Sequence, residues 1–191
     1  MTPTIARVTI EGITPYSQSR QHDEPKIEGE NLTDYDKRTW RAKLNTATRN
    51  GKPTVVIPAH GLHQAIAKRQ IPGQGKATWT AKFTAGITLL EDPALGIAPD
   101  TVDGVTISAN ADGVRGSGKR VPRKFPIMPE WSATFDVMVL DPIITEDVFA
   151  EMLTMAGMFI GVGRFRPEKG GTNGRFRIKS LVWEDNRKLA A

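Results

Sequence analysis

The stretch Ala156–Lys179, AGMFIGVGRFRPEKGGTNGRFRIK, decides the fold. An apolar helical run ends at Ile160, and five glycines follow over residues 161–174. The residues from Arg175 to Trp183 then alternate polar and apolar side chains, as a half-buried strand does. The sequence therefore predicts a helix, a glycine-rich loop and a final strand, in that order.

Basic side chains surround the glycines of this loop, which are Gly161, Gly163, Gly170, Gly171 and Gly174. The cations are Arg164, Arg166, Lys169, Arg175, Arg177 and Lys179, and Glu168 is the single acid among them. Glycine permits positive φ and the close approach of another chain, and a guanidinium group suits phosphate. The loop is therefore a candidate cradle for a polyanion, and a mobile loop with solvated charges explains the same pattern.

The composition is that of an ordinary globular protein with a basic balance. The chain has 26 Lys and Arg against 21 Asp and Glu, a net charge of +5 and a pI near 9.6, which permits nucleic-acid binding. There is no cysteine, so disulfides and thiolate metal sites are excluded. No apolar run reaches transmembrane length and no signal-peptide pattern is present. We expect a cytoplasmic protein that does not bind membranes.

Hydrophobic periodicity predicts an α+β fold. The expected strands are Ile5–Ile13, Val55–Pro58, Thr78–Leu90, Trp131–Leu140 and Arg175–Trp183. The expected helices are Tyr35–Leu44 with Thr33 as its cap, Ala59–Arg69, and a helix that Thr145 caps. This order predicts a ferredoxin-like (RRM-like) split βαβ sheet with two helices on one face and two long insertions. The second insertion is expected to be irregular, with a short strand at Val105–Ser108.

A second basic cluster lies at the end of that insertion, and no acid follows Asp112 within it. Its members are Arg115, Lys119, Arg120, Arg123 and Lys124. The preceding glycines resemble a phosphate-binding P-loop, but Arg120 replaces the required hydroxyl residue and Pro122 argues against the helix. The cluster is therefore interpreted as a basic hairpin that contacts a nucleic-acid backbone, or as a solvated loop. Trp40, between Arg38 and Arg41, is the candidate for stacking on a base.

Catalytic and metal-binding patterns are not found. His60 and His63 lie three residues apart on the predicted helix, and His22 lies in the first insertion. Zinc requires three or four ligands, and there is no HExxH motif. No nucleophile with a neighbouring base can be named. The sequence therefore predicts no cofactor, no metal and no identifiable catalytic residue, which favours a protein that is not an enzyme.

Three stretches resemble the RAMP superfamily of CRISPR-associated proteins, and within it the backbone subunits that polymerise along guide RNA. They are the opening strand and turn at Val8–Pro15, the segment Gly51–Arg69 that enters the first helix, and the glycine-rich loop from Gly161 to Gly174 with the following Arg-Phe. Ala59-His60-Gly61 departs from the family's Gly-Ser-Ser turn. The resemblance implies one RAMP-like domain over 1–191, with an arm at about 17–51 and a thumb at about 91–124. The short length is typical of a diverged relative encoded by a phage or mobile element.

Three functions follow from these patterns. The first is a non-enzymatic protein that assembles along single-stranded RNA or DNA, as a homo-oligomer or as a subunit of a larger complex. It uses the basic thumb and the glycine-rich loop to hold the strand. The second is a metal-independent endoribonuclease that uses His22 or His60. The third is a structural or inhibitory module that binds another protein.

Overall fold

The computed structural model describes residues 3–68, 76–110 and 118–184. Within these ranges the strands are β1 (Thr4–Gly12), β2 (Tyr16–Ser17), β3 (Thr46–Arg49), β4 (Lys52–Val55), β5 (Ile87–Leu89), β6 (Asp103–Asn110), β7 (Arg120–Met128), β8 (Ser132–Val139) and β9 (Phe176–Glu184). The α-helices are α1 (Leu32–Thr39), α2 (Ala59–Ala67), α3 (Lys76–Gly86) and α4 (Glu146–Met155). Shorter helical segments are η1 (Trp40–Lys43), η2 (Pro99–Thr101), the π-helical η3 (Ala156–Ile160) and η4 (Pro167–Lys169).

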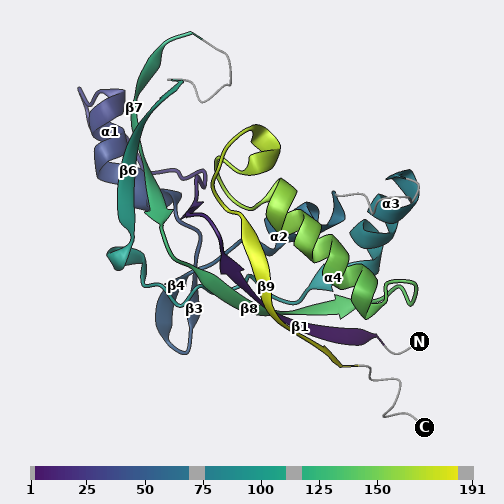
Figure 1. The fold of residues 1–191 in the computed structure, drawn as a ribbon. Helices are drawn as coiled ribbons and strands as arrows, with labels where there is room; N and C mark the ends of the chain where they lie inside the picture. Colours follow the sequence, from purple (N-terminus) through teal and green to yellow (C-terminus); the bar gives the residue numbers. More distant parts are fainter. Residues whose placement is uncertain (1–2, 69–75, 111–117, 185–191) are drawn as a thin grey trace.

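A four-stranded antiparallel sheet holds the centre of the molecule, in the strand order β5-β8-β1-β9. β1 lies between β8 and β9, so both of its edges are paired (Figure 1). Ala6, Val8 and Ile10 are fully buried and alternate with residues that are exposed or half-buried. Because side chains of a strand point to opposite faces in turn, this alternation buries one face of the sheet.

Helices α2 and α4 cover that buried face (Figure 1). Leu62 and Ile66 of α2 are four residues apart and fully buried, and so are Phe149 and Leu153 of α4. This spacing places each pair on one side of its helix. The helix predicted at Ala59–Arg69 is present as α2, and the expected mixed α+β class with antiparallel strands is confirmed.

A hairpin of β6 and β7 stands out from the sheet, and α1 lies beside it (Figure 1). The pairing runs from Asp103 opposite Ile127 to Asn110 opposite Arg120, and β2 pairs with the other edge of β7 at Met128. Helix α1 and the β6–β7 hairpin, which come from segments far apart in the sequence, therefore pack against each other.

Three expectations about local structure are wrong. The strand predicted at Thr78–Leu90 is helix α3 followed by the short strand β5. Among residues 80–85, Phe83 alone is buried, which fits one inward position per helical turn and not the alternation of a strand. The second insertion is less irregular than expected: the short strand predicted at Val105–Ser108 is present within the longer β6, and the insertion also contains the start of β7. Helix α1 begins earlier than predicted, and the side chain of Asn31, not Thr33, accepts the capping bond from Asp34 N at 3.0 Å.

Candidate functional site

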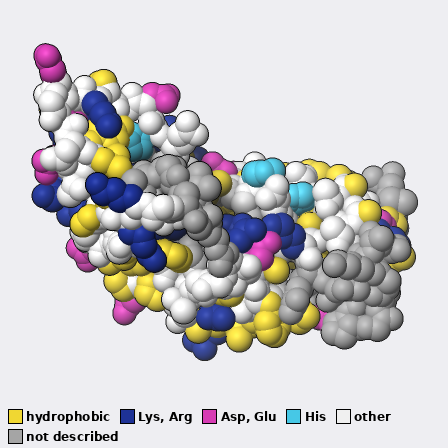
Figure 2. All heavy atoms as spheres, turned by 90° about the horizontal axis from the view of Figure 1, so that it is seen from above, with side chains coloured by type: hydrophobic (Ala, Val, Ile, Leu, Met, Phe, Trp, Pro, Cys, Tyr) yellow, Lys and Arg dark blue, Asp and Glu magenta, His cyan; other side chains and the backbone are white. Residues whose placement is uncertain are grey.

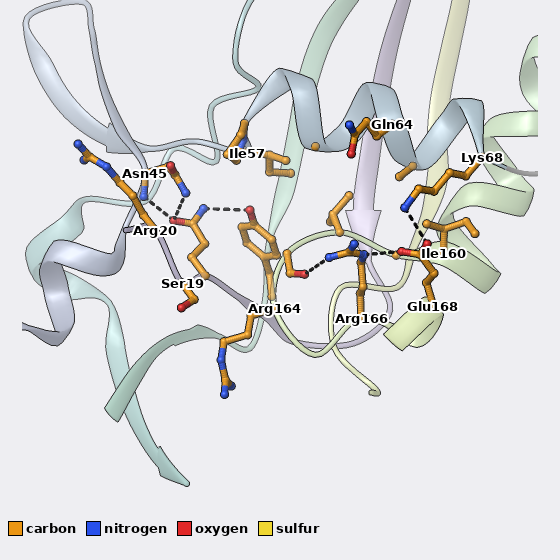
Figure 3. A pocket seen from close by; sticks show the side chains of 18 residues that line it. Ser19, Arg20, Asn45, Ile57, Gln64, Lys68, Ile160, Arg164, Arg166 and Glu168 are labelled. Carbon is orange, nitrogen blue, oxygen red and sulfur yellow. Dashed lines mark hydrogen bonds and ion pairs between the residues drawn. The ribbon is translucent and has the colours of Figure 1, made fainter. Parts of the chain in front are cut away.

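A groove of about 460 Å³ lies between α2, the segment 16–20 and the glycine-rich loop of residues 161–174 (Figure 3). Four basic residues contribute to its lining, namely Arg20, Lys68, Arg164 and Arg166, and one acid, Glu168, lies among them. Seen from above, basic side chains gather in the middle of this face of the molecule (Figure 2). The groove therefore carries an excess of positive charge.

The glycine-rich loop is fixed by backbone hydrogen bonds. Val162 N donates to Gly174 O at 3.0 Å, and Arg164 N donates to Ser17 O at 2.7 Å. Gly163 and Gly174 have φ of +75° and +73°, a region that glycine adopts without strain. A Cβ on Gly163 would meet the carbonyl oxygen of Ser17, and one on Gly174 would meet that of Val162. The glycines therefore let the loop fold tightly onto itself and onto residues 15–17, and the expectation of a loosely held surface loop does not fit these contacts.

Glu168 joins the two sides of the groove. Its carboxylate accepts from Lys68 Nζ of α2 at 2.7 Å and from Arg166 Nε of the loop at 2.9 Å (Figure 3). Burial would raise the pKa of Glu168, but the two basic partners outweigh it and hold the pKa below its usual value. The carboxylate is therefore ionised at neutral pH, and it occupies the position between two cations that a phosphate group would suit.

Arg164 is held by aromatic rings and not by an acid. Its Cζ lies 3.5 Å from the ring centroid of Phe125 in β7 and 4.0 Å from that of Phe165 in the loop. No carboxylate pairs with it among the residues that the structure describes. Burial, followed by the nearby charge of Arg123, lowers the pKa of Arg164 to about 10. A half-buried cation is thus placed where the groove meets the hairpin.

The base of the hairpin contains a buried charge cluster. Asp36 of α1 is 1% exposed and accepts from Lys43 Nζ at 3.0 Å and from Arg123 Nε at 2.8 Å. Burial opposes ionisation of Asp36, but the bonds from Arg123 and Lys43 hold its pKa below the ordinary value. Burial also lowers the pKa of Lys43. Arg123, predicted to contact nucleic acid, therefore ties the hairpin to the first insertion.

The other basic residues predicted for the hairpin have different surroundings. Lys119 and Arg120 are exposed, whereas Lys124 places its Nζ 4.7 Å from the ring centroid of Trp40. Arg115 lies outside the described residues. Trp40 is 5% exposed, and the guanidinium of Arg41 also lies over its ring. The proposed stacking of a base on Trp40 therefore does not fit this structure, because the ring is covered.

The basic residues predicted near the last strand do not share one surface. Arg175 precedes β9, and its Nε donates to Met158 O at 3.1 Å, beside the helices. Arg177 lies on the uncovered face of the sheet and pairs with Glu11 at 2.6 Å. Lys169 is exposed in η4. Of the predicted loop cations, Arg164 and Arg166 thus line the groove.

Sequence reasoning missed Arg20 and Lys68, which also line the groove. Arg20 stands in a polar segment of mixed charge, and Lys68 lies 100 residues before its partner Glu168. Lys68 falls within the Gly51–Arg69 segment of the family resemblance, which was the one signal that pointed to it. Within the described ranges no group of three or more His, Asp or Glu side chains is placed to hold a metal ion. No helix in those ranges is both long and apolar enough to cross a membrane.

No family model and no curated protein matches the chain. Among solved structures it is similar to a chain of the Type III-B Cmr-beta complex bound to cognate target RNA, with a TM-score of 0.49 and 15% identity over 96% of this chain and 61% of that chain. It is similar to Cmr6 from Pyrococcus furiosus, with a TM-score of 0.45 and 13% identity over 93% of this chain and 100% of that one.

A third similar structure belongs to a CRISPR RNA-guided surveillance complex, with a TM-score of 0.41 and 10% identity over 90% of this chain and 66% of that chain. The chain thus spans less than two thirds of the first and third of these proteins.

Proposed function

We propose that the protein is a non-enzymatic nucleic-acid-binding protein that holds single-stranded RNA or DNA in the groove. The groove itself carries this proposal, because four basic residues and one acid line it, and a tightly folded glycine-rich loop forms one of its walls. Lys68 and Arg166 already hold a carboxylate between them. A phosphate of the strand takes the place of Glu168 at these two cations, since both groups present paired oxygen acceptors.

The architecture is proposed to be the ferredoxin-like split βαβ fold. The chain order β1, α2, β5, β8, α4, β9 combined with the sheet order β5-β8-β1-β9 supports this assignment. The single domain covers 1–191, the arm corresponds to residues 17–51 and the thumb to residues 91–124. Exposed Lys119 and Arg120 are then placed on the thumb hairpin, beyond the groove.

The partners are proposed to be further copies of the chain or other subunits of a complex. A nucleic-acid strand that leaves the groove past Arg164 meets the projecting β6–β7 hairpin, and the exposed cations of the hairpin then contact the phosphates of that strand. A protein of this shape covers a short length of strand, so neighbouring subunits along the strand extend the contact. Nucleic acid that copurifies with the protein, judged from the ultraviolet absorbance ratio before and after nuclease treatment, shows that a strand is bound, and a fall in the protein's apparent mass after nuclease shows that the strand holds several subunits together.

The decisive experiment measures affinity for labelled single-stranded RNA and DNA by fluorescence anisotropy over a salt series. Lys68→Ala removes one groove cation, so the slope of log K against log salt falls by about one phosphate contact. Glu168→Gln removes the competing carboxylate, so affinity rises. Lys52→Ala on the β3–β4 hairpin and Glu151→Gln on α4 make the same charge changes at exposed positions that line no part of the groove, and they leave affinity unchanged.

Two results contradict this proposal. The first is a wild-type protein that binds neither nucleic acid at low salt. The second is cleavage of labelled RNA without metal that disappears in His22→Ala or His60→Ala while the protein remains folded, which would support the endoribonuclease instead.

A further inference from the structure

Phe165 is a large side chain in a backbone conformation that suits glycine. Its φ is +57°, in the left-handed region that bulky residues adopt rarely and at a cost. The surrounding loop holds it there, because Asn173 N donates to Phe165 O at 2.9 Å and Gly171 packs directly against the Phe165 backbone. The loop contains glycine at several neighbouring positions, so a phenylalanine at this one requires a reason in its side chain.

The core does not supply that reason. Phe165 is 46% exposed, so nearly half of its surface stays open to solvent. Among the described residues, the ring of Phe165 contacts the guanidinium of Arg164, whose Cζ lies 4.0 Å from the ring centroid. A carbon atom that close to the centroid cannot lie in the plane of the ring without clashing, so the guanidinium covers a face of Phe165.

The ring of Phe125, the guanidinium of Arg164 and the ring of Phe165 lie in layers, from the hairpin outward. Phe125, 3% exposed, lies under the guanidinium of Arg164 at 3.5 Å, and Phe165 packs on the same guanidinium from the loop. Arg164 is positively charged in this setting because its pKa of about 10 is above neutral pH. A cation beneath an aromatic ring orients it and polarises it, which supports a further planar group on the exposed side.

We propose that Phe165 is a stacking platform for one unpaired nucleobase. This inference rests on the proposed function and adds to it the residue that contacts a base; the base is unpaired because a base inside a duplex has no free face to offer. The phosphate on one side of the stacked base then lies near Arg166 and Lys68 of the groove, because Phe165 stands in the chain between Arg164 and Arg166, which both line it. The strained backbone of Phe165 fixes the ring beside the guanidinium of Arg164. The ring recognises the face of any base, so the contact selects single strands and not a sequence.

The test compares Phe165→Asn with Phe165→Trp. Asparagine tolerates the left-handed conformation, so the loop keeps its shape while the ring is lost. Phe165→Asn is expected to weaken binding of single-stranded RNA and DNA by about 5- to 150-fold, the range measured for one base stacked on an aromatic residue. Phe165→Trp retains wild-type affinity. The salt slope stays unchanged in both variants, because no phosphate contact is removed.

The controls are a duplex of the same length and an abasic strand that keeps its phosphates. Neither offers an unpaired base, so Phe165→Asn changes affinity for them by less than about twofold. An equal loss on the abasic strand, or no loss on single strands, overturns the stacking role while wild-type binding still supports the groove. Absence of all nucleic-acid binding by the wild-type protein overturns the proposed function itself.

Discussion

Replacing Gly163, which lines the groove, tests whether the stability of the loop depends on a backbone conformation that only glycine adopts without strain. Its φ of +75° and the carbonyl oxygen of Ser17 leave no room for a Cβ, so Gly163→Ala is expected to lower the free energy of unfolding by at least about 1 kcal/mol. Gly61→Ala on the exposed side of α2, where no atom lies within 4 Å of the added carbon, is expected to raise it by up to about 1 kcal/mol. Urea unfolding measures both, and equal effects of the two substitutions would contradict this geometry.

At the level of single residues, part of the candidate site was readable from the sequence. Arg164 and Arg166 stand among glycines, and local clustering was enough to select them. Arg123 was selected for the same reason, but it pairs with Asp36, 87 residues away. No local pattern shows which acid a cation will meet after folding. The exposure of Phe165 and the burial of Trp40 likewise depend on contacts between distant segments.

Helix α4 provides a prediction at the scale of an element. Thr145 Oγ1 accepts from Val148 N at 3.4 Å, which satisfies one of the amides that have no partner within the helix. Thr145→Ala is expected to lower the free energy of unfolding by about 1 kcal/mol. Thr154→Ala, an exposed change on the same helix, shifts it by less than about 0.5 kcal/mol. Thermal unfolding followed by circular dichroism distinguishes them, and a larger effect at Thr154 would count against the cap.

Helices and strands whose buried residues recur at a regular spacing were predicted well from the sequence, and the other elements were not. β1, β8 and α4 each have buried positions at regular spacing, and each was recognised from that spacing. The hairpin strand β7 contains Pro122 and Pro126, which normally argue against a strand. β7 nevertheless pairs with β6 at both prolines. Its basic residues conceal the alternation of polar and apolar side chains by which a strand is recognised in a sequence. Helix α3 was mistaken for a strand because threonine and aromatic residues favour strands when packing is not known.

The melting temperature of the whole molecule is expected to depend on pH in the acid range. Five carboxylates have pKa values lowered by basic partners, namely Glu11, Glu30, Asp36, Asp136 and Glu168. A pKa that is lower in the folded state contributes stability above the unfolded value of about 4, and this contribution is lost as the pH falls through the folded value. The melting temperature is therefore expected to stay level from pH 7 to about 5 and to fall steeply below about 4. Differential scanning fluorimetry measures it, and a level melting temperature down to pH 2 would be inconsistent with these shifts.

The carboxylate of Asp36 has a consequence for how proteins of this shape can diverge. It joins α1 and the end of η1 to the hairpin strand β7, although the helices α2 and α3 and several strands lie between these segments in the chain. A hairpin without an arginine at position 123 leaves the buried carboxylate of Asp36 with Lys43 alone, and the two hydrogen bonds that the guanidinium donates are lost. The arm and the hairpin must therefore be exchanged together, as one inherited module.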